Sequence, residues 1–252
     1  MEVDARGAAP TAAAFPDWRV SPNIHVSPDV YEIENQAIAR AGHVRAALRA
    51  LAPWDGRVLV DLGCGTGFWL PAYLSEPGRA HRVIGVEPDP VLLQRAAARV
   101  AGLEDVSVVA GSAEHIPLPD RSADVVHAMF AYFLSPGGDA GLAEVLRVLR
   151  PGGSLVVVDN DYRWGQFAGL LAAAATTPPS RKAAEIDAWW RDRGATRHEV
   201  RSEWRFAGRE DLEAVLSIEF PAEVAGDWLA ANPATTGLTY GYVLFRVIRP
   251  AR

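Results

Sequence analysis

Residues 58–67 read VLVDLGCGTG, an apolar run that ends in glycines at alternate positions. The run itself has the near-continuous apolar pattern of a strand that helices cover on both faces, as in a parallel sheet. Gly63, Gly65 and Gly67 begin where that strand should stop, and glycine permits a sharp turn whose backbone another group can approach closely. Phe68–Pro71 then predicts the start of a helix. The stretch therefore predicts a strand, a tight turn and a helix N-terminus that suits a bound ligand.

The alternation of strand and helix patterns continues after this turn. Further strand patterns occur at residues 82–87, 106–110, 124–129 and 154–159. Asp89 as N-cap with Pro90 behind it predicts a helix after the second strand, and Asp139 as cap predicts another that ends at the Arg150-Pro151-Gly152-Gly153 turn. Strands and helices at this spacing form right-handed crossovers, which predicts an α/β fold with a doubly wound, parallel sheet.

The N-terminal region has a different pattern. Residues 1–16 are rich in alanine and proline without periodicity, which predicts a tail. Apolar residues at steps of three or four predict an amphipathic helix over residues 28–51, with Gly42 as a candidate break. Residues 15–26 are apolar without periodicity and need a surface to cover. We expect residues 1–53 to form a tail and a helical lid over an occupied site, the alternative being a static brace for the sheet.

The C-terminal third contains more helices and two strand patterns. Residues 197–206 alternate strictly, with arginine and glutamate on one face, which is typical of a solvated edge strand; a substrate clamp is the alternative. The remaining patterns predict helices at 180–193, 208–217 and 222–231 and a last strand at 239–248. We therefore expect residues 54–252 to form a single domain with a helical insertion around residues 207–232.

Composition narrows the possible partners. The chain has 252 residues, 49% of them hydrophobic, and a net charge of -6, so it gives no long-range attraction to nucleic acid or to anionic lipid. Its single cysteine, Cys64, excludes an internal disulfide and fits a reducing compartment. The acidic start and the short apolar stretches favour a cytoplasmic protein without membrane attachment. We expect no metal site, and no sequence feature sets the oligomeric state.

Two classes of nucleotide cofactor compete for the glycine turn. The NAD fingerprint requires glycine at positions 63, 65 and 68, but position 68 is Phe and the third glycine is Gly67. The stretch from Asp61 to Gly67, DLGCGTG, instead resembles the first motif of the class I S-adenosylmethionine-dependent methyltransferases. In that family the turn passes close to the amino-acid part of the cofactor.

Further stretches carry the same resemblance in the same order. Glu87 ends the second strand 20 residues after Gly67, where an acidic side chain of the family accepts bonds from the ribose hydroxyls. Residues 110–120 (AGSAEHIPLPD) resemble the loop that meets the adenine edge, although Ser112 replaces the usual Asp. Residues 147–159 (RVLRPGGSLVVVD) are similar to the family's small-molecule branch. The implied cofactor-binding residues are Asp61, Gly63, Cys64, Gly65, Gly67, Glu87, Pro88, Ser112, Ala113, Glu114 and Ala128.

Simpler roles for these residues stay open. The glycines can serve only a tight turn, Glu87 can be only a helix-start carboxylate, and Cys64 is most simply a small residue that fills the turn. Each of these alternatives concerns the local backbone and requires no ligand.

The resemblance implies a Rossmann-like fold, with a mostly parallel, seven-stranded sheet and helices on both faces, and it implies transfer of a methyl group from S-adenosylmethionine. The chain after the fourth strand reads AMFAYFL, without the Asn/Asp-Pro-Pro-Tyr/Phe motif of the amino-methylating nucleic-acid enzymes. This favours a small-molecule acceptor, with O-methylation preferred. A methylase of protein or nucleic acid and a cofactor-binding module without catalysis are the alternatives.

Removal of a proton from an oxygen acceptor suggests four candidate bases. His25 lies on the expected lid and Asp159 at the expected end of the fifth strand, and these two are preferred. His127 has a suitable intrinsic pKa but lies inside the fourth strand, which favours a core histidine, and Tyr132 follows that strand. The strongest alternative is that no base exists and that positioning alone suffices.

Overall fold

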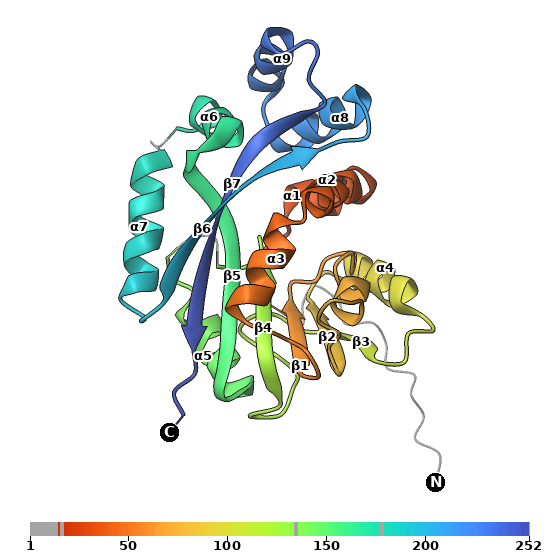
Figure 1. The fold of residues 1–252 in the computed structure, drawn as a ribbon, viewed down its shortest axis with the longest axis vertical. Helices are drawn as coiled ribbons and strands as arrows, with labels where there is room; N and C mark the ends of the chain where they lie inside the picture. Colours follow the sequence, from red (N-terminus) through yellow and green to blue (C-terminus); the bar gives the residue numbers. More distant parts are fainter. Residues whose placement is uncertain (1–14, 16–17, 134–135, 177–178, 252) are drawn as a thin grey trace.

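The computed structural model describes residues 15, 18–133, 136–176 and 179–251. A seven-stranded sheet with strand order β3-β2-β1-β4-β5-β7-β6 runs through this part of the chain (Figure 1). Its strands are β1 (Val58–Leu62), β2 (Arg82–Glu87), β3 (Val106–Ala110), β4 (Ala123–Met129), β5 (Leu149–Trp164), β6 (Thr196–Arg205) and β7 (Gly237–Ile248). The first five are parallel, and β7 runs antiparallel between β5 and β6. The expected mostly parallel, seven-stranded sheet is confirmed.

Helices cover both faces of the sheet. They are α1 (Pro22–Val26), α2 (Pro28–Ala41), α3 (His43–Leu51), α4 (Pro90–Val100), α5 (Asp139–Val148), α6 (Gly165–Ala174), α7 (Pro179–Arg191), α8 (Arg209–Glu219) and α9 (Ala222–Ala231). One apolar core joins the sheet to α2, α3, α4, α6, α8 and α9, and a second joins its other face to α5 and α7. Residues of β1 point alternately into the two cores, as its continuous apolar pattern requires.

Several predicted boundaries are confirmed by local chemistry. Gly42 has a left-handed backbone (φ 72°) and separates α2 from α3. The Asp89 carboxylate accepts hydrogen bonds from the backbone N–H groups of Val91 and Leu92 and so caps α4. β6 forms an edge of the sheet, as its alternating charged face indicates.

Two predicted boundaries are wrong. No α-helix follows the glycine turn: residues Leu70–Leu74 form only a short 3-10 helix, η2, because Pro77 and Gly78 follow within a turn and an α-helix of that length is marginal. The fifth strand extends beyond its predicted range of residues 154–159 at both ends and runs from Leu149 to Trp164, and β7 pairs with it from Ser154 to Asn160.

The long strands β5, β6 and β7 extend past the others, and α6, α8 and α9 lie at that end of the sheet (Figure 1). α8 and α9 connect β6 to β7, in the region of the expected helical insertion. Across the described residues, no helix has the length and apolar character needed to cross a bilayer.

Candidate active site

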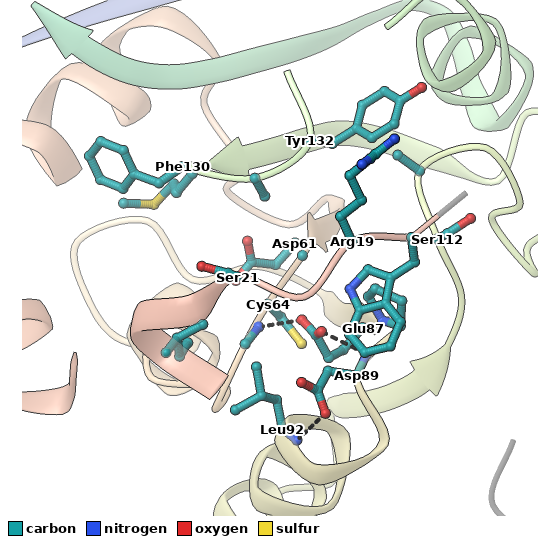
Figure 2. Close-up of a pocket in the computed structure, with 18 of the residues that line it drawn as sticks. Arg19, Ser21, Asp61, Cys64, Glu87, Asp89, Leu92, Ser112, Phe130 and Tyr132 are labelled. Carbon is teal, nitrogen blue, oxygen red and sulfur yellow. Dashed lines mark hydrogen bonds between the residues drawn. The ribbon is translucent and has the colours of Figure 1, made fainter. Parts of the chain in front are cut away.

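A cavity of about 770 Å³ lies at the carboxyl ends of β1, β2, β3 and β4. Its volume is typical of a small-molecule site, and its position matches the ligand crevice of open α/β sheets. Three parts of the chain form its walls: the glycine turn with the ends of β2 and β3, the loop after β4, and the N-terminal segment, which we define as residues 18–51. Figure 2 shows Glu87 and Ser112 facing Phe130 and Tyr132 across this space.

Gly63 and Gly65 allow two other walls of the cavity to approach the turn. Both have left-handed backbones (φ 74° and 56°). A Cβ at Gly63 would lie 2.5 Å from the Cβ of Ala131 in the loop after β4, and a Cβ at Gly65 would lie 2.8 Å from the Cδ1 of Ile24 in α1. Gly63 and Gly65 therefore do serve a tight turn. Both glycines also line the cavity, whereas Gly67 packs against α4 and does not.

Glu87 presents a carboxylate at the centre of the cavity wall. One of its oxygens accepts from the backbone N–H of Gly65 at 2.8 Å and the other from that of Asp89 at 3.0 Å. Burial raises the pKa of Glu87 to about 7, although these two hydrogen bonds lower it in part. Because Asp89 already caps α4, the helix does not need Glu87 as its cap. The remaining lone pairs of Glu87 suit hydroxyl donors of a ligand.

The cavity lining is strongly acidic. Burial, and after it the neighbouring Glu87, raises the pKa of Asp61 to about 7. Asp89 and Glu114 also line the cavity, and among its described lining residues Arg19 is the one cationic side chain. Such a lining favours a cationic ligand over a neutral or anionic one.

The loop after β4 has an unusual backbone. Phe130 and Tyr132 have φ values of 52° and 56°, which bulky residues seldom adopt, and both side chains line the cavity. The Tyr132 hydroxyl accepts from the backbone N–H of Gly141 at 3.2 Å, and the Phe130 ring lies 5.9 Å from that of Tyr242. Strained conformations of this kind collect at functional sites.

The N-terminal segment is joined to the glycine turn and α4 by polar contacts. His25 Nδ1 lies 2.5 Å from the Asp89 carboxylate, while Glu32 accepts from the Thr66 hydroxyl and pairs with Arg99 at 2.7 Å. Trp18, Arg19, Ser21, Pro22 and Ile24 consequently form one wall of the cavity.

Comparison with known proteins shows what this fold and its cavity resemble. Residues 59–153 match the family model described as a methyltransferase domain, which spans β1 to the start of β5. This part of the chain is therefore similar to a methyltransferase domain. The sheet order of the protein, with an antiparallel β7, is that of the family fold. A solved S-adenosylmethionine-dependent methyltransferase from Aquifex aeolicus has the same fold, with a TM-score of 0.58 and 16% identity over 92% of this chain and 100% of that one.

Two curated methyltransferases resemble the chain in sequence. An arsenite methyltransferase of Halobacterium salinarum is 35% identical over 45% of this chain and 29% of its own length. A demethylmenaquinone methyltransferase of Staphylococcus aureus is 32% identical over 42% of this chain and 49% of its own length. The chain thus spans less than half the length of these curated relatives.

S-adenosylmethionine is the cofactor of this methyltransferase family, and the residues present fit it. The open glycine turn, the inward-facing carboxylate of Glu87 and the acidic lining suit a cationic sulfonium that carries a ribose. Pro88, Ser112, Ala113 and Glu114 also line the cavity. Ala128 is buried within β4 and does not. Cys64 fills the space above Gly85, whose Cβ would lie 2.7 Å from its sulfur, and burial raises the pKa of its thiol.

The four candidate bases lie in different environments. Tyr132 lines the cavity, and His25 lies beside it, paired with Asp89. His127 is fully buried against Trp54 and Tyr73, and burial lowers its pKa to about 3. Asp159 lies within β5 and lines a second, small cavity with residues of α7, so the expectation that it faces the acceptor does not fit its place in the structure.

Tyr31, Asn35 and Trp69 are among the lining residues that sequence reasoning did not name. Tyr31 and Asn35 are one turn apart on α2, next to the apolar stripe by which the helix was recognised, and that spacing is the signal that could have found them. Trp69 falls in the stretch for which an α-helix was wrongly expected.

Proposed function

We propose that the protein transfers a methyl group from S-adenosylmethionine to a small organic acceptor, with oxygen as the favoured nucleophile. The single observation that carries this proposal is the shared cavity. The glycine turn and Glu87, which match the family's cofactor motifs, form one side of it, and aromatic and aliphatic side chains form the other. Cofactor and acceptor can therefore meet in one enclosed space.

The acceptor side of the cavity supports a small, largely apolar molecule. Ile24, Tyr31, Trp69, Met129 and Phe130 all contribute to the lining. The net charge of -6 supports the absence of a nucleic-acid partner, and the proposed location is the cytoplasm. The two curated relatives are named for small acceptors, arsenite and demethylmenaquinone, which is consistent with this class.

Methyl transfer from a sulfonium is an in-line displacement, so the protein has to align the reactants and exclude water. The cofactor supplies the reactive methyl group. In this proposal Glu87 and the glycine turn hold the ribose and amino-acid ends, while the N-terminal segment closes over the site as a lid. Among the four candidate bases, only Tyr132 lines the cavity, which supports positioning over base catalysis by Asp159 or His127.

The experiment that tests this proposal combines binding with transfer of label. Calorimetry should show binding of S-adenosylmethionine and S-adenosylhomocysteine, and incubation with methyl-labelled cofactor and cell extract should place label in the low-mass fraction. Label in protein or nucleic acid would favour the alternative methylases. Tight cofactor binding with no transfer to any fraction would favour a module without catalysis. Glu87→Ala serves as the control that is deficient in cofactor binding.

A further inference from the structure

Asn35 is a buried polar residue in the wall of the cavity that the N-terminal segment forms. It lies on α2, one turn after Tyr31, and both residues line the cavity. Its side chain is only 8% exposed, so its amide has to find partners among protein or ligand atoms. The roles assigned above to the glycine turn and Glu87 leave Asn35 without a function.

Trp69 fixes the orientation of this amide. The indole N–H of Trp69 donates to Oδ1 of Asn35 at 3.1 Å. An indole nitrogen can only donate, so the Asn35 oxygen must face Trp69 and its NH2 group must point the other way. Trp69 directly follows the glycine turn and packs edge-on against Phe68, with ring centroids 5.2 Å apart. The orientation of the amide is thus set by the same segment that forms the cofactor turn.

The NH2 group of Asn35 has no acceptor in the described part of the chain. Protein atoms do not fully enclose this nitrogen. It is therefore in contact with the cavity that Asn35 lines. Ile24, Met129 and Phe130 contribute apolar surface to the same cavity. A buried amide donor beside such surface is costly unless a ligand supplies an acceptor atom.

Building on the proposed function, we propose that the side-chain NH2 of Asn35 donates a hydrogen bond to an oxygen atom of the methyl acceptor. This makes Asn35 a specificity-determining residue. It selects molecules with a carbonyl oxygen on a mainly apolar body, and it selects against an ammonium group at this point, which has no lone pair to accept the bond.

The test compares two probes that differ in one atom. Calorimetry measures the binding of 3-hydroxyacetophenone and 3-isopropenylphenol, in which a methylene group replaces the carbonyl oxygen, to protein saturated with S-adenosylhomocysteine and to protein alone. The wild type should prefer the ketone by about tenfold or more, since the analogue leaves a buried donor unpaired. Asn35→Leu should abolish the preference. Gln36→Leu, on the exposed face of the same helix, should keep it.

Two further variants test whether the orientation of the Asn35 amide, and not only the size of the side chain, determines the preference. Asn35→Asp retains an oxygen for Trp69 but replaces the donor with an acceptor, so the preference for the ketone should be lost or reversed. Trp69→Phe removes the N–H that orients the amide, and the preference should decrease. An unchanged preference in either variant, equal binding of the two probes by the wild type, or binding of neither would overturn the assignment.

The carboxylate of the cofactor itself is the alternative acceptor for the hydrogen bond that the Asn35 NH2 donates. Binding of S-adenosylhomocysteine and of 5′-methylthioadenosine, which lacks the amino-acid part, should change by a similar small factor in Asn35→Leu. A loss confined to S-adenosylhomocysteine would assign Asn35 to the cofactor and overturn the proposal. Wild-type protein that binds neither nucleoside would contradict the proposed function, and the probe comparison without nucleoside would still decide the role of Asn35.

Discussion

Glu87 combines two tasks in one buried carboxylate. It holds the backbone N–H groups of Gly65 and Asp89, and through them it joins the glycine turn to the start of α4. It also lines the cavity, where we propose that it binds the ribose of the cofactor. A ligand hydroxyl would therefore meet a carboxylate that is already held in place by the backbone, so little rotamer freedom is lost on binding.

Replacement of Glu87 should weaken cofactor binding more than it weakens folding. Glu87→Ala removes a charged acceptor from a buried site, and we expect a loss of about 1.5–3 kcal/mol in the binding of S-adenosylmethionine. Glu87→Gln keeps one acceptor oxygen and should lose less. Calorimetry measures both, with the exposed Glu104→Ala as control. A dissociation constant that Glu87→Ala leaves unchanged would limit Glu87 to a local role in the turn.

Replacement of Asp159 should change the pH dependence of stability more than it changes the rate of methyl transfer. Burial raises the pKa of Asp159 to about 7, while the carboxyl of an unfolded chain ionises near pH 4. The folded protein therefore retains a proton that the unfolded chain releases, and the contribution of Asp159 to the free energy of unfolding falls as pH rises between these values. Asp159→Asn cannot ionise, so its stability relative to the wild type should increase from pH 5 to pH 8, by at most about 3 kcal/mol.

Urea denaturation at the two pH values checks this expectation, with the exposed Asp227→Asn as control. Transfer rates of Asp159→Asn should stay within about tenfold of the wild type, because removal of a true general base typically lowers the rate by about 10²-fold or more. A larger loss of rate with unchanged stability would restore Asp159 as a base.

At the scale of elements, α1 is held by polar contacts more than by burial, unlike α2 and α3, which belong to the apolar core. α1 has no buried residue, yet it supplies Pro22 and Ile24 to the cavity wall. Asn23 donates to Glu219 of α8 at 2.5 Å, and His25 contacts Asp89 of α4. An element with many polar contacts and little buried apolar surface opens at low cost, which suits a lid.

Deletion of residues 1–26 tests the lid. Because α1 buries no residue and α2 and α3 remain to cover the sheet, the truncated protein should fold, with a melting temperature close to that of the full chain. Turnover should fall by at least about tenfold, since one wall of the cavity is lost and water can enter. Circular dichroism and transfer of labelled methyl provide the two measurements. Full turnover in the truncated protein would make the segment a static brace.

The sequence predicts the elements whose signals are local. The glycine turn, the Asp89 cap of α4 and the break at Gly42 each depend on residues within a few positions, and all three are confirmed. The length of β5 depends on pairing with β7, which comes from far along the chain, so the strand end at Asp159 was wrong. The spacing of Tyr31 and Asn35 places them on one face of α2, but which face meets the cavity depends on how α2 packs across the sheet, and that packing involves residues far along the chain.

At the scale of the whole molecule, the charge of the cavity should make cofactor binding depend on pH. The pKa values of Asp61 and Glu87 are both raised to about 7, for which burial is the main cause. A cationic ligand with donor hydroxyls stabilises the ionised carboxylates, so binding releases protons and affinity should increase as pH rises from about 6 to 8. Calorimetry in buffers of different ionisation enthalpy counts these protons. Glu87→Gln should reduce the dependence, and a constant affinity in the wild type would contradict it.

The left-handed backbones of Phe130 and Tyr132 have a consequence for laboratory evolution. Each conformation costs on the order of 1–3 kcal/mol, which glycine would not incur. Glycine would also remove the packing of Phe130 against Tyr242 and of Tyr132 against Phe133, which opposes that gain. Clones selected for heat resistance alone should therefore keep both aromatic residues, and with them the surface against which a substrate is held.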